Sequence, residues 1–163
     1  MDIFLSTHIN KIDAKGRVSV PATFRTALSS SATGPATGII VYRALHHDAL
    51  EACSPAHLEL LSQSMDKLDL TPEAYELIET TIFGGSMHVP MDAEGRMILP
   101  EGLRDAAGIK DSAAFVGRRN TFQIWQPAKF TTYMDAQRKQ AKAHDISLSK
   151  IIADAKSRVT LND

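Results

Sequence analysis

The chain has 163 residues, 44% of them hydrophobic, so it can bury a core of ordinary size, although either half alone would be marginal by surface-to-volume scaling. No apolar run approaches the ~18 residues of a membrane-spanning helix, and acidic Asp2 stands where a signal peptide is basic, so we expect a soluble, cytoplasmic protein without a membrane partner. The single cysteine, Cys53, lies in an apolar stretch and cannot form an internal disulfide, so we expect it to be buried without a chemical role.

The net charge of −1 at first argues against a nucleic-acid partner, but the charges are unevenly distributed along the chain. Residues 1–45 carry five basic and two acidic side chains, residues 46–86 carry one and eight, and residues 87–163 carry twelve and nine. Two basic regions therefore flank an acidic connector. The carboxylates of this connector, taken alone, are most simply a solvated helical face.

Residues 4–12 show a mostly extended, half-buried pattern, which predicts a strand. Residues 13–16, Asp-Ala-Lys-Gly, fit a tight turn in which the Asp side chain accepts a backbone N–H and Gly supplies an unusual dihedral angle. A strand is predicted over 17–20. Pro21 then suits the first turn of a short helix over 21–28.

A surface loop is expected over 29–38, because these residues offer nothing to anchor in a core. Strands over 39–43 and 49–53 follow. The acidic connector then begins with a helix from Pro55 to about Asp66, in which leucines recur at helical spacing.

A second connector helix is predicted to begin at Pro72, with Thr71 as its N-cap. Its apolar side chains recur at helical spacing, and the Gly84-Gly85 pair is expected to end it. The connector is therefore helical almost throughout.

The turn and its surroundings occur twice in the chain. Residues 13–25 (DAKGRVSVPATFR) return as residues 92–104 (DAEGRMILPEGLR), without a gap and with identity at six positions. Strands over 114–118 and 121–125 are the expected counterparts of the two strands that precede the connector. An internal duplication predicts a pseudo-two-fold unit within one subunit, the geometry expected of proteins that read duplex DNA.

After Pro127 a helix is predicted to about Lys142, and beyond a break near His144 a second helix is predicted over 146–155, with residues 157–163 frayed. The expected organisation has four parts, namely a first module (1–54), an acidic helical connector (55–85), a second module (86–142) and a helical tail (143–163).

Cationic side chains next to a protruding turn are suited to a phosphate or a base edge. Arg17 follows the first turn directly, its guanidinium can bind two acceptors, and Lys15 adds a second positive charge. The alternative is that Arg17 pairs with Asp13, and Arg96 with Asp92, to fix the turns. We favour the structural role for Asp13, Gly16 and their counterparts, and nucleic-acid binding for Lys15 and Arg17.

The second turn differs from the first in charge. Glu94 replaces Lys15 and would repel phosphate, so the first turn is expected to carry more of the affinity and the second to complete the fold. Gly95, the counterpart of Gly16, is expected to be a structural glycine of this second turn. Arg25 and Arg104 each follow a proline by four residues. They are either ordinary surface residues of a helix or DNA contacts, and the sequence does not decide between these interpretations.

Other chemistries have little support in the sequence. His46-His47-Asp48 is the tightest cluster of metal-ligating types, but no further Cys or His stands at zinc-site spacing, so we expect no metal. No nucleophile, phosphate-loop or metalloprotease motif is present, so we expect no enzyme activity, cofactor or small-molecule substrate.

The unit of strand, Asp-x-x-Gly-Arg turn, strand, proline and helix resembles the swapped-hairpin DNA-binding module of the AbrB class. Two such units, with Asp13 to Arg17 in one and Asp92 to Arg96 in the other, on either side of an acidic helical connector, resemble the MraZ family of bacterial transcriptional regulators. The resemblance covers residues 1 to about 142 and leaves the tail from Ile146 unassigned.

This resemblance implies an α+β fold, a duplicated swapped-hairpin β-barrel with short helices, a helical connector and a helical tail. It implies closed homo-oligomeric rings that bind double-stranded DNA at short direct repeats upstream of a division and cell-wall gene cluster, repress that cluster and reside at the nucleoid. By the family's pattern Arg17 is the leading DNA contact, and Lys15, Arg25, Arg96 and Arg104 are further candidates.

A second hypothesis comes from the class of interaction proteins. A ring-forming scaffold or antidote-like partner of another protein would use the same hairpins and bind DNA weakly, and Glu94 and the low net charge favour it.

Overall fold

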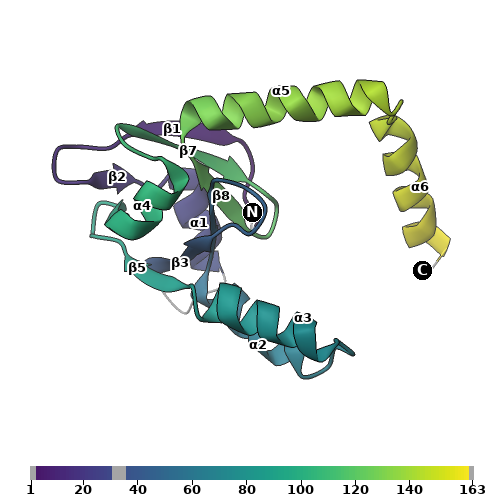
Figure 1. Ribbon diagram of the computed structural model, residues 1–163, viewed down its shortest axis with the longest axis horizontal. Coiled ribbons are helices and arrows are strands. Elements are labelled where there is room, and N and C mark those ends of the chain that lie inside the picture. The colour runs from purple at the N-terminus through teal and green to yellow at the C-terminus, as the bar shows by residue number, and fades with distance from the viewer. Residues whose placement is uncertain (1–2, 31–35, 162–163) are drawn as a thin grey trace. The chain divides into compact units, whose positions relative to one another are not determined.

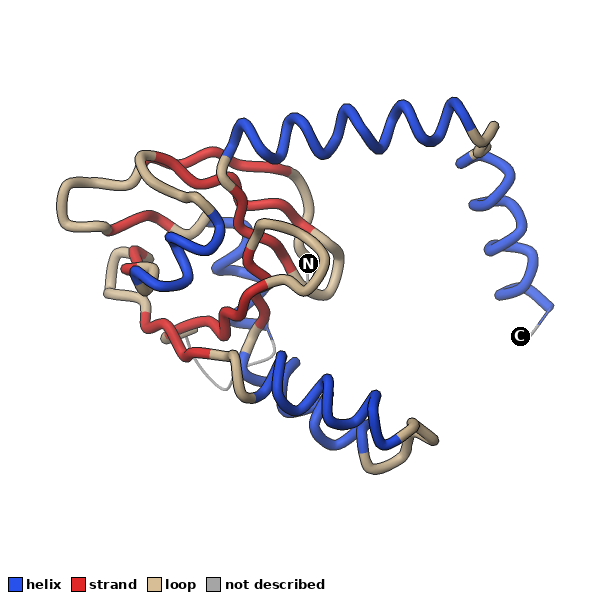
Figure 2. Tube along the Cα trace, viewed as in Figure 1, coloured by secondary structure: helices blue, strands red, loops and turns tan. Residues whose placement is uncertain are grey.

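The computed structural model describes residues 3–30 and 36–161, and it has two compact units, residues 1–129 and 130–163 (Figure 1). The fold is mixed α and β with antiparallel sheets (Figure 2). The helices and strands are β1 (Thr7–Lys11), β2 (Arg17–Ser19), α1 (Ala22–Ser30), β3 (Gly38–Arg43), β4 (Leu50–Cys53), α2 (Pro55–Met65), α3 (Pro72–Ile78), the π-helical turn η1 (Glu79–Phe83), β5 (Met87–Pro90), β6 (Arg96–Ile98), α4 (Glu101–Ala107), β7 (Ser112–Gly117), β8 (Phe122–Trp125), α5 (Pro127–Ala143) and α6 (Leu148–Leu161).

The helix starts follow from local sequence. The Ser54 and Thr71 side chains cap α2 and α3 by accepting the backbone N–H groups of His57 and Ala74, and a proline occupies the first turn of each helix. Within the described ranges, no helix has the length and apolar character needed to span a membrane.

Strands from the two copies are interleaved in one sheet. The six-stranded sheet has the order β1-β7-β8-β4-β3-β5, and β2 pairs with β6 in a separate two-stranded sheet. The first strand of each copy therefore pairs with the third strand of the other copy, β1 with β7 and β5 with β3. Because each copy supplies the neighbours of the other, neither copy has a complete sheet of its own.

The registers give the duplication an approximate two-fold axis. Val18 pairs with Met97, which is its own counterpart in the repeat, at the centre of the β2–β6 ladder. Glu51 likewise pairs with Gln123 at the centre of the β4–β8 ladder. The Gln123 side chain, 2% exposed, donates a 2.7 Å hydrogen bond from Nε2 to Oε1 of Glu51, which satisfies the buried amide at this axis.

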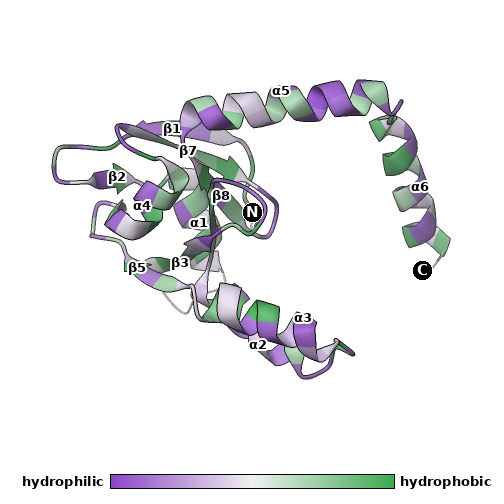
Figure 3. Cartoon of the chain, viewed as in Figure 1, coloured by the Kyte–Doolittle hydropathy of each residue, from purple (hydrophilic) through white to green (hydrophobic). Residues whose placement is uncertain are grey.

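The core lies between the two copies and is rich in aromatic rings. Phe24 contacts Phe4 edge-on at a ring-centroid distance of 5.3 Å and Phe122 at 5.0 Å, so rings of both copies pack together. Strands β7 and β8 are largely green in the hydropathy view (Figure 3). Cys53 is buried as expected, and burial raises the pKa of its thiol to about 11.

Several expected boundaries are wrong. Helix α1 includes Ser29 and Ser30, whose hydroxyls donate to backbone carbonyls of the preceding turn, and Ala36 packs against the core; residues 31–35 of the expected loop lie outside the described residues. The sequence comparison, which aligns residues 39–43 with 114–118, makes Ala113 the counterpart of Gly38. The β1–β7 and β3–β5 ladders instead make Ser112 its counterpart, a shift of one residue.

The tail also differs from the sequence prediction. Helix α6 begins at Leu148, with Ser147 accepting the Lys150 N–H, and it continues through residues 157–161, which the sequence predicted to be frayed. Residues 162–163 lie outside the described residues. The break before this helix is at Asp145, which has a positive φ of 51°.

The interleaved core predicts that both copies unfold together. Phe24→Ala removes a fully buried ring of the first copy, and we expect a loss of about 3–5 kcal/mol in the free energy of unfolding. The fluorescence of Trp125, in the second copy, should report the whole loss in a urea titration. Leu161→Ala, at an exposed position of the other unit, is the control and should leave the Trp125 midpoint unchanged. An unshifted midpoint in Phe24→Ala would show that the copies unfold independently.

Candidate nucleic-acid interface

The first turn is organised by one carboxylate. Asp13 Oδ1 accepts the backbone N–H groups of Lys15 and Arg17, both at 2.9 Å, and the Asp13 carbonyl accepts the Gly16 N–H at 2.9 Å. Gly16 has a φ of +80°, which side-chain-bearing residues rarely adopt. The residue types at these positions are therefore those that the turn geometry requires.

Arg17 is fixed by the same carboxylate. Its Nε donates to Asp13 Oδ2 at 2.8 Å, while its side chain stays 33% exposed. The hydrogen bond from the Arg17 backbone N–H, followed by those from its side chain and from Lys15, holds the pKa of Asp13 below its ordinary value. Since Asp13 uses only Nε, the ion pair orients the guanidinium, and no partner of its two terminal nitrogens is described.

The second turn repeats this backbone geometry. Asp92 Oδ1 accepts the N–H groups of Glu94 and Arg96 at 2.9 Å, and Oδ2 accepts Arg96 Nε at 2.9 Å. Gly95 has a φ of +77°. The pKa of Asp92 is lowered for the same reason as that of Asp13, chiefly by the Arg96 backbone N–H.

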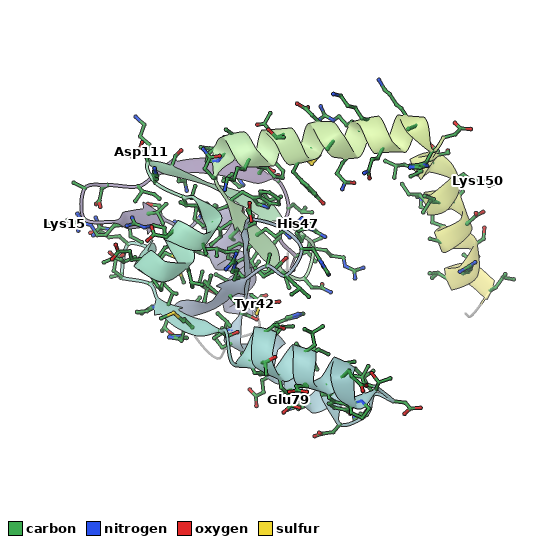
Figure 4. The ribbon with its side chains drawn as sticks, in the orientation of Figure 1. Lys15, Tyr42, His47, Glu79, Asp111 and Lys150 are labelled. Atoms are coloured by element: carbon green, nitrogen blue, oxygen red, sulfur yellow. The ribbon has the colours of Figure 1, made fainter. Side chains whose placement is uncertain are left out.

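Glu94 gives the second turn a different charge arrangement. Its carboxylate lies 3.4 Å from Nη2 of Arg96, so this guanidinium is neutralised by both Asp92 and Glu94. The hydrogen bond to Asp92, with the charges of Asp92, Glu94 and Asp13, raises the pKa of Arg96. Lys15 occupies the equivalent position of the first turn and is labelled at the outer end of that turn (Figure 4).

The two helix arginines cross to the opposite copy. Arg25 of the first copy lies over Gly95, and its Nη1 donates to the Glu94 carbonyl at 3.4 Å. Arg104 of the second copy lies over Gly16, where a Cβ would meet its Nη1 at 3.4 Å. Among the described residues, the buried Nε atoms of both arginines have no hydrogen-bond partner. Each turn is thus completed by a cation from the other copy.

The structure therefore groups the predicted cations differently from their order in the chain. Arg104 lies over the turn that carries Lys15 and Arg17, and Arg25 lies over the turn that carries Arg96. Arg17 and Arg96 also line one hollow beside the β2–β6 ladder, together with Pro90, Met91, Asp92, Met97 and Ile98. The sequence did not reveal the crossing, because the spacing of an arginine from its own turn does not show which turn it reaches.

No metal centre emerges from the part of the chain that the structure describes, where no three His, Cys, Asp or Glu side chains gather. Asp48 of the His-His-Asp cluster instead lies 3.8 Å from Nζ of Lys129. His47 packs against Trp125 with a ring-centroid distance of 5.6 Å.

Comparison with known proteins identifies the family. A protein-family model described as "MraZ protein, putative antitoxin-like" matches residues 82–159. A transcriptional regulator MraZ of Rickettsia felis is 39% identical over 148 residues, which are 91% of this chain and 97% of that protein. Its counterpart in Rickettsia bellii is 43% identical over 149 residues, with the same two shares. The chain belongs to the MraZ family.

The lowered carboxyl pKa values predict a pH-dependent stability. Ionised Asp13 and Asp92 stabilise the fold above the ordinary pKa of a carboxyl group, and this stabilisation is lost as the pH falls from that value through the lowered one. We expect the free energy of unfolding to fall in this acid range, and less steeply in the double variant D13N/D92N. NMR titration of the two carboxyl groups checks the cause, and midpoints at the ordinary value would contradict it.

The crossing arginine predicts a difference between the two turn glycines. Gly16→Ala and Gly95→Ala should each cost about 1–2 kcal/mol, because both residues have positive φ. Gly95→Ala should cost more, since its Cβ would lie 2.7 Å from Cζ of Arg25. Chemical denaturation of both variants, each with and without Arg25→Ala, measures the difference. It should shrink when Arg25 is removed, and an unchanged difference would show that Arg25 does not cover Gly95 in solution.

Proposed function

We propose that the protein is a sequence-specific DNA-binding transcriptional regulator. The observation that carries this proposal is the first turn, where Asp13 holds Arg17 by Nε alone and the Arg17 side chain stays one-third exposed in the same turn as Lys15. A guanidinium held in this way is suited to a phosphate or to the O6 and N7 acceptors of guanine. The name of the Rickettsia relatives, transcriptional regulator, is consistent with this function.

The candidate contact set is Lys15, Arg17, Arg25, Arg96 and Arg104. Lys15 and Arg17 lead this set, because the carboxylate of Glu94 faces Arg96 in the second turn. Arg25 and Arg104 each cover the opposite turn, and their guanidinium groups place a positive charge beside it. Asp13, Gly16, Asp92 and Gly95 build the turns.

We also propose a domain organisation with two swapped-hairpin modules, residues 1–54 and 86–142, which together form a duplicated barrel. A connector over 55–85 joins the modules, and a tail over 143–163 follows them. The pairing of β1 with β7 and of β5 with β3 supports an exchange of strands between the modules.

Assembly into a homo-oligomeric ring would reconcile DNA binding with the low net charge of one subunit. One subunit offers few cations, and each neutralised phosphate adds only ~0.9 to the slope of log K against log salt. Several linked subunits on one duplex multiply these contacts and gain avidity of roughly 10² or more where the spacing fits. Short direct repeats upstream of a division and cell-wall gene cluster are the proposed sites, repression the proposed outcome, and the cytoplasmic nucleoid the proposed location.

A second candidate function is a protein-interaction module. The net charge of −1 and the Glu94–Arg96 contact favour it, since both weaken attraction to phosphate. In this case the same ring would serve as a scaffold or antidote-like partner, with weak DNA binding.

Mobility shift with DNA from upstream of the protein's own gene separates the two candidates. We expect Arg17→Ala to weaken binding by roughly 5- to 150-fold, the value of one good base contact of 1–3 kcal/mol. Lys15→Gln, which leaves the Asp13–Arg17 pair intact, should lower the salt slope by ~0.9 for each subunit that contacts a phosphate. Arg158→Ala removes the same charge from the exposed face of α6 and should leave binding unchanged.

Light scattering and thermal unfolding of each variant serve as controls for assembly and folding. Undiminished binding by Arg17→Ala and Lys15→Gln would remove the first turn from the interface. Absence of specific binding by the wild type would favour the interaction module, and a monomer that binds its site tightly would contradict the ring.

A further inference from the structure

The approximate two-fold axis raises a question of direction. The axis passes between Val18 and Met97 and exchanges the two turns, which protrude beyond the sheet in the view of Figure 1. If both turns bound DNA equally, a subunit could lie on a duplex in either of two opposite directions with the same contacts. A feature that distinguishes the turns would remove this ambiguity.

Backbone geometry does not distinguish them. The carboxylate distances agree within 0.1 Å, with Arg17 Nε to Asp13 at 2.8 Å and Arg96 Nε to Asp92 at 2.9 Å. The two glycines have φ values of 80° and 77°. Each turn is also covered by one arginine of the opposite copy. The side-chain charges of the two turns, by contrast, are opposite at one position.

The charge differs at one equivalent position. Lys15 in the first turn corresponds to Glu94 in the second, a difference of two charges at the third position of each turn. Glu94 is 71% exposed on its side chain and reaches Nη2 of Arg96 at 3.4 Å. It therefore both repels phosphate and occupies a terminal nitrogen that would bind it. For Arg17, no acidic partner is described beyond Asp13.

We propose that Glu94 is a specificity-determining residue that gives each subunit one direction on DNA. It keeps the second turn away from the phosphates, so the first turn makes the close contact and the two ends of the pseudo-symmetric subunit are inequivalent. The inference rests on the proposed DNA binding and adds to it that the unequal turns give the subunit one direction on the duplex. Arg25, next to the Glu94 carbonyl, supports the second turn without restoring its contact.

The repeat supplies a matched pair of probe positions. Ala14 and Ala93 are equivalent, exposed residues of the two turns. Ala14→Cys and Ala93→Cys each place one thiol for a short-arm photo-crosslinker, and the wild type, whose Cys53 is buried with a pKa raised to about 11, measures the background. Each labelled full-length protein is irradiated on the DNA fragment used for mobility shift.

We expect the Ala14→Cys protein to crosslink the DNA several-fold more than the Ala93→Cys protein. Adding Glu94→Gln, which keeps the size of the side chain and removes its charge, should raise the Ala93→Cys yield toward that of Ala14→Cys and leave the Ala14→Cys yield nearly unchanged. Glu94→Gln should also steepen the salt slope by up to ~0.9 for each subunit on the DNA, since Arg96 becomes available to a phosphate. Replacing Glu101, an exposed residue at the start of α4, by Gln removes the same charge and should change neither quantity.

The outcomes separate this inference from the proposed function. Equal crosslinking by both turns in the otherwise wild-type protein, or a Glu94→Gln variant with unchanged yields, overturns the role of Glu94 while DNA binding stands. Crosslinking chiefly from Ala93→Cys reverses the direction and also overturns it. If the unlabelled wild type fails to shift the DNA, the proposed function itself fails.

Discussion

The structure of the first unit depends on antiparallel pairing between the two copies at the pseudo-two-fold axis. Val18 pairs with its counterpart Met97, and Glu51 pairs with its counterpart Gln123. Away from these positions, the first strand of each copy completes the sheet of the other. A half chain would leave strand edges and aromatic core residues exposed to water, which explains why a domain of this size contains two copies and not one.

The same pairing positions the turns. Each turn leads into a strand of the β2–β6 ladder, so its Asp-to-Arg contacts stand on a buried base formed by both copies. The carboxylate of each turn satisfies backbone N–H groups and also orients an arginine, so a single residue determines both the local fold and the placement of the cation. The structural and the functional interpretations of Arg17 are therefore compatible. Asp13 orients the guanidinium through Nε, and the proposed DNA contact would use the two terminal nitrogens.

Much of the local structure was predictable from sequence. The turn residues, the proline-led helices and the cap Thr71 depend on neighbours within four positions, and the structure has them where the sequence indicates. The end of α1 and the one-residue shift in β3 were missed, because weakly apolar or polar residues there follow contacts with the rest of the core. The π-helical turn at Glu79–Phe83 had no signal beyond the helical pattern that precedes it.

The sequence by itself determined the duplication, the two Asp-anchored turns and the charge difference between Lys15 and Glu94, because each is a matter of residue type and short spacing. Only the tertiary structure decided that β1 pairs with β7 and that Arg25 and Arg104 each cover the turn of the other copy. A strand pattern specifies which face is buried but not which strand lies beside it. Partners 69 residues apart, such as Arg25 and Glu94, meet only when the whole sheet has formed.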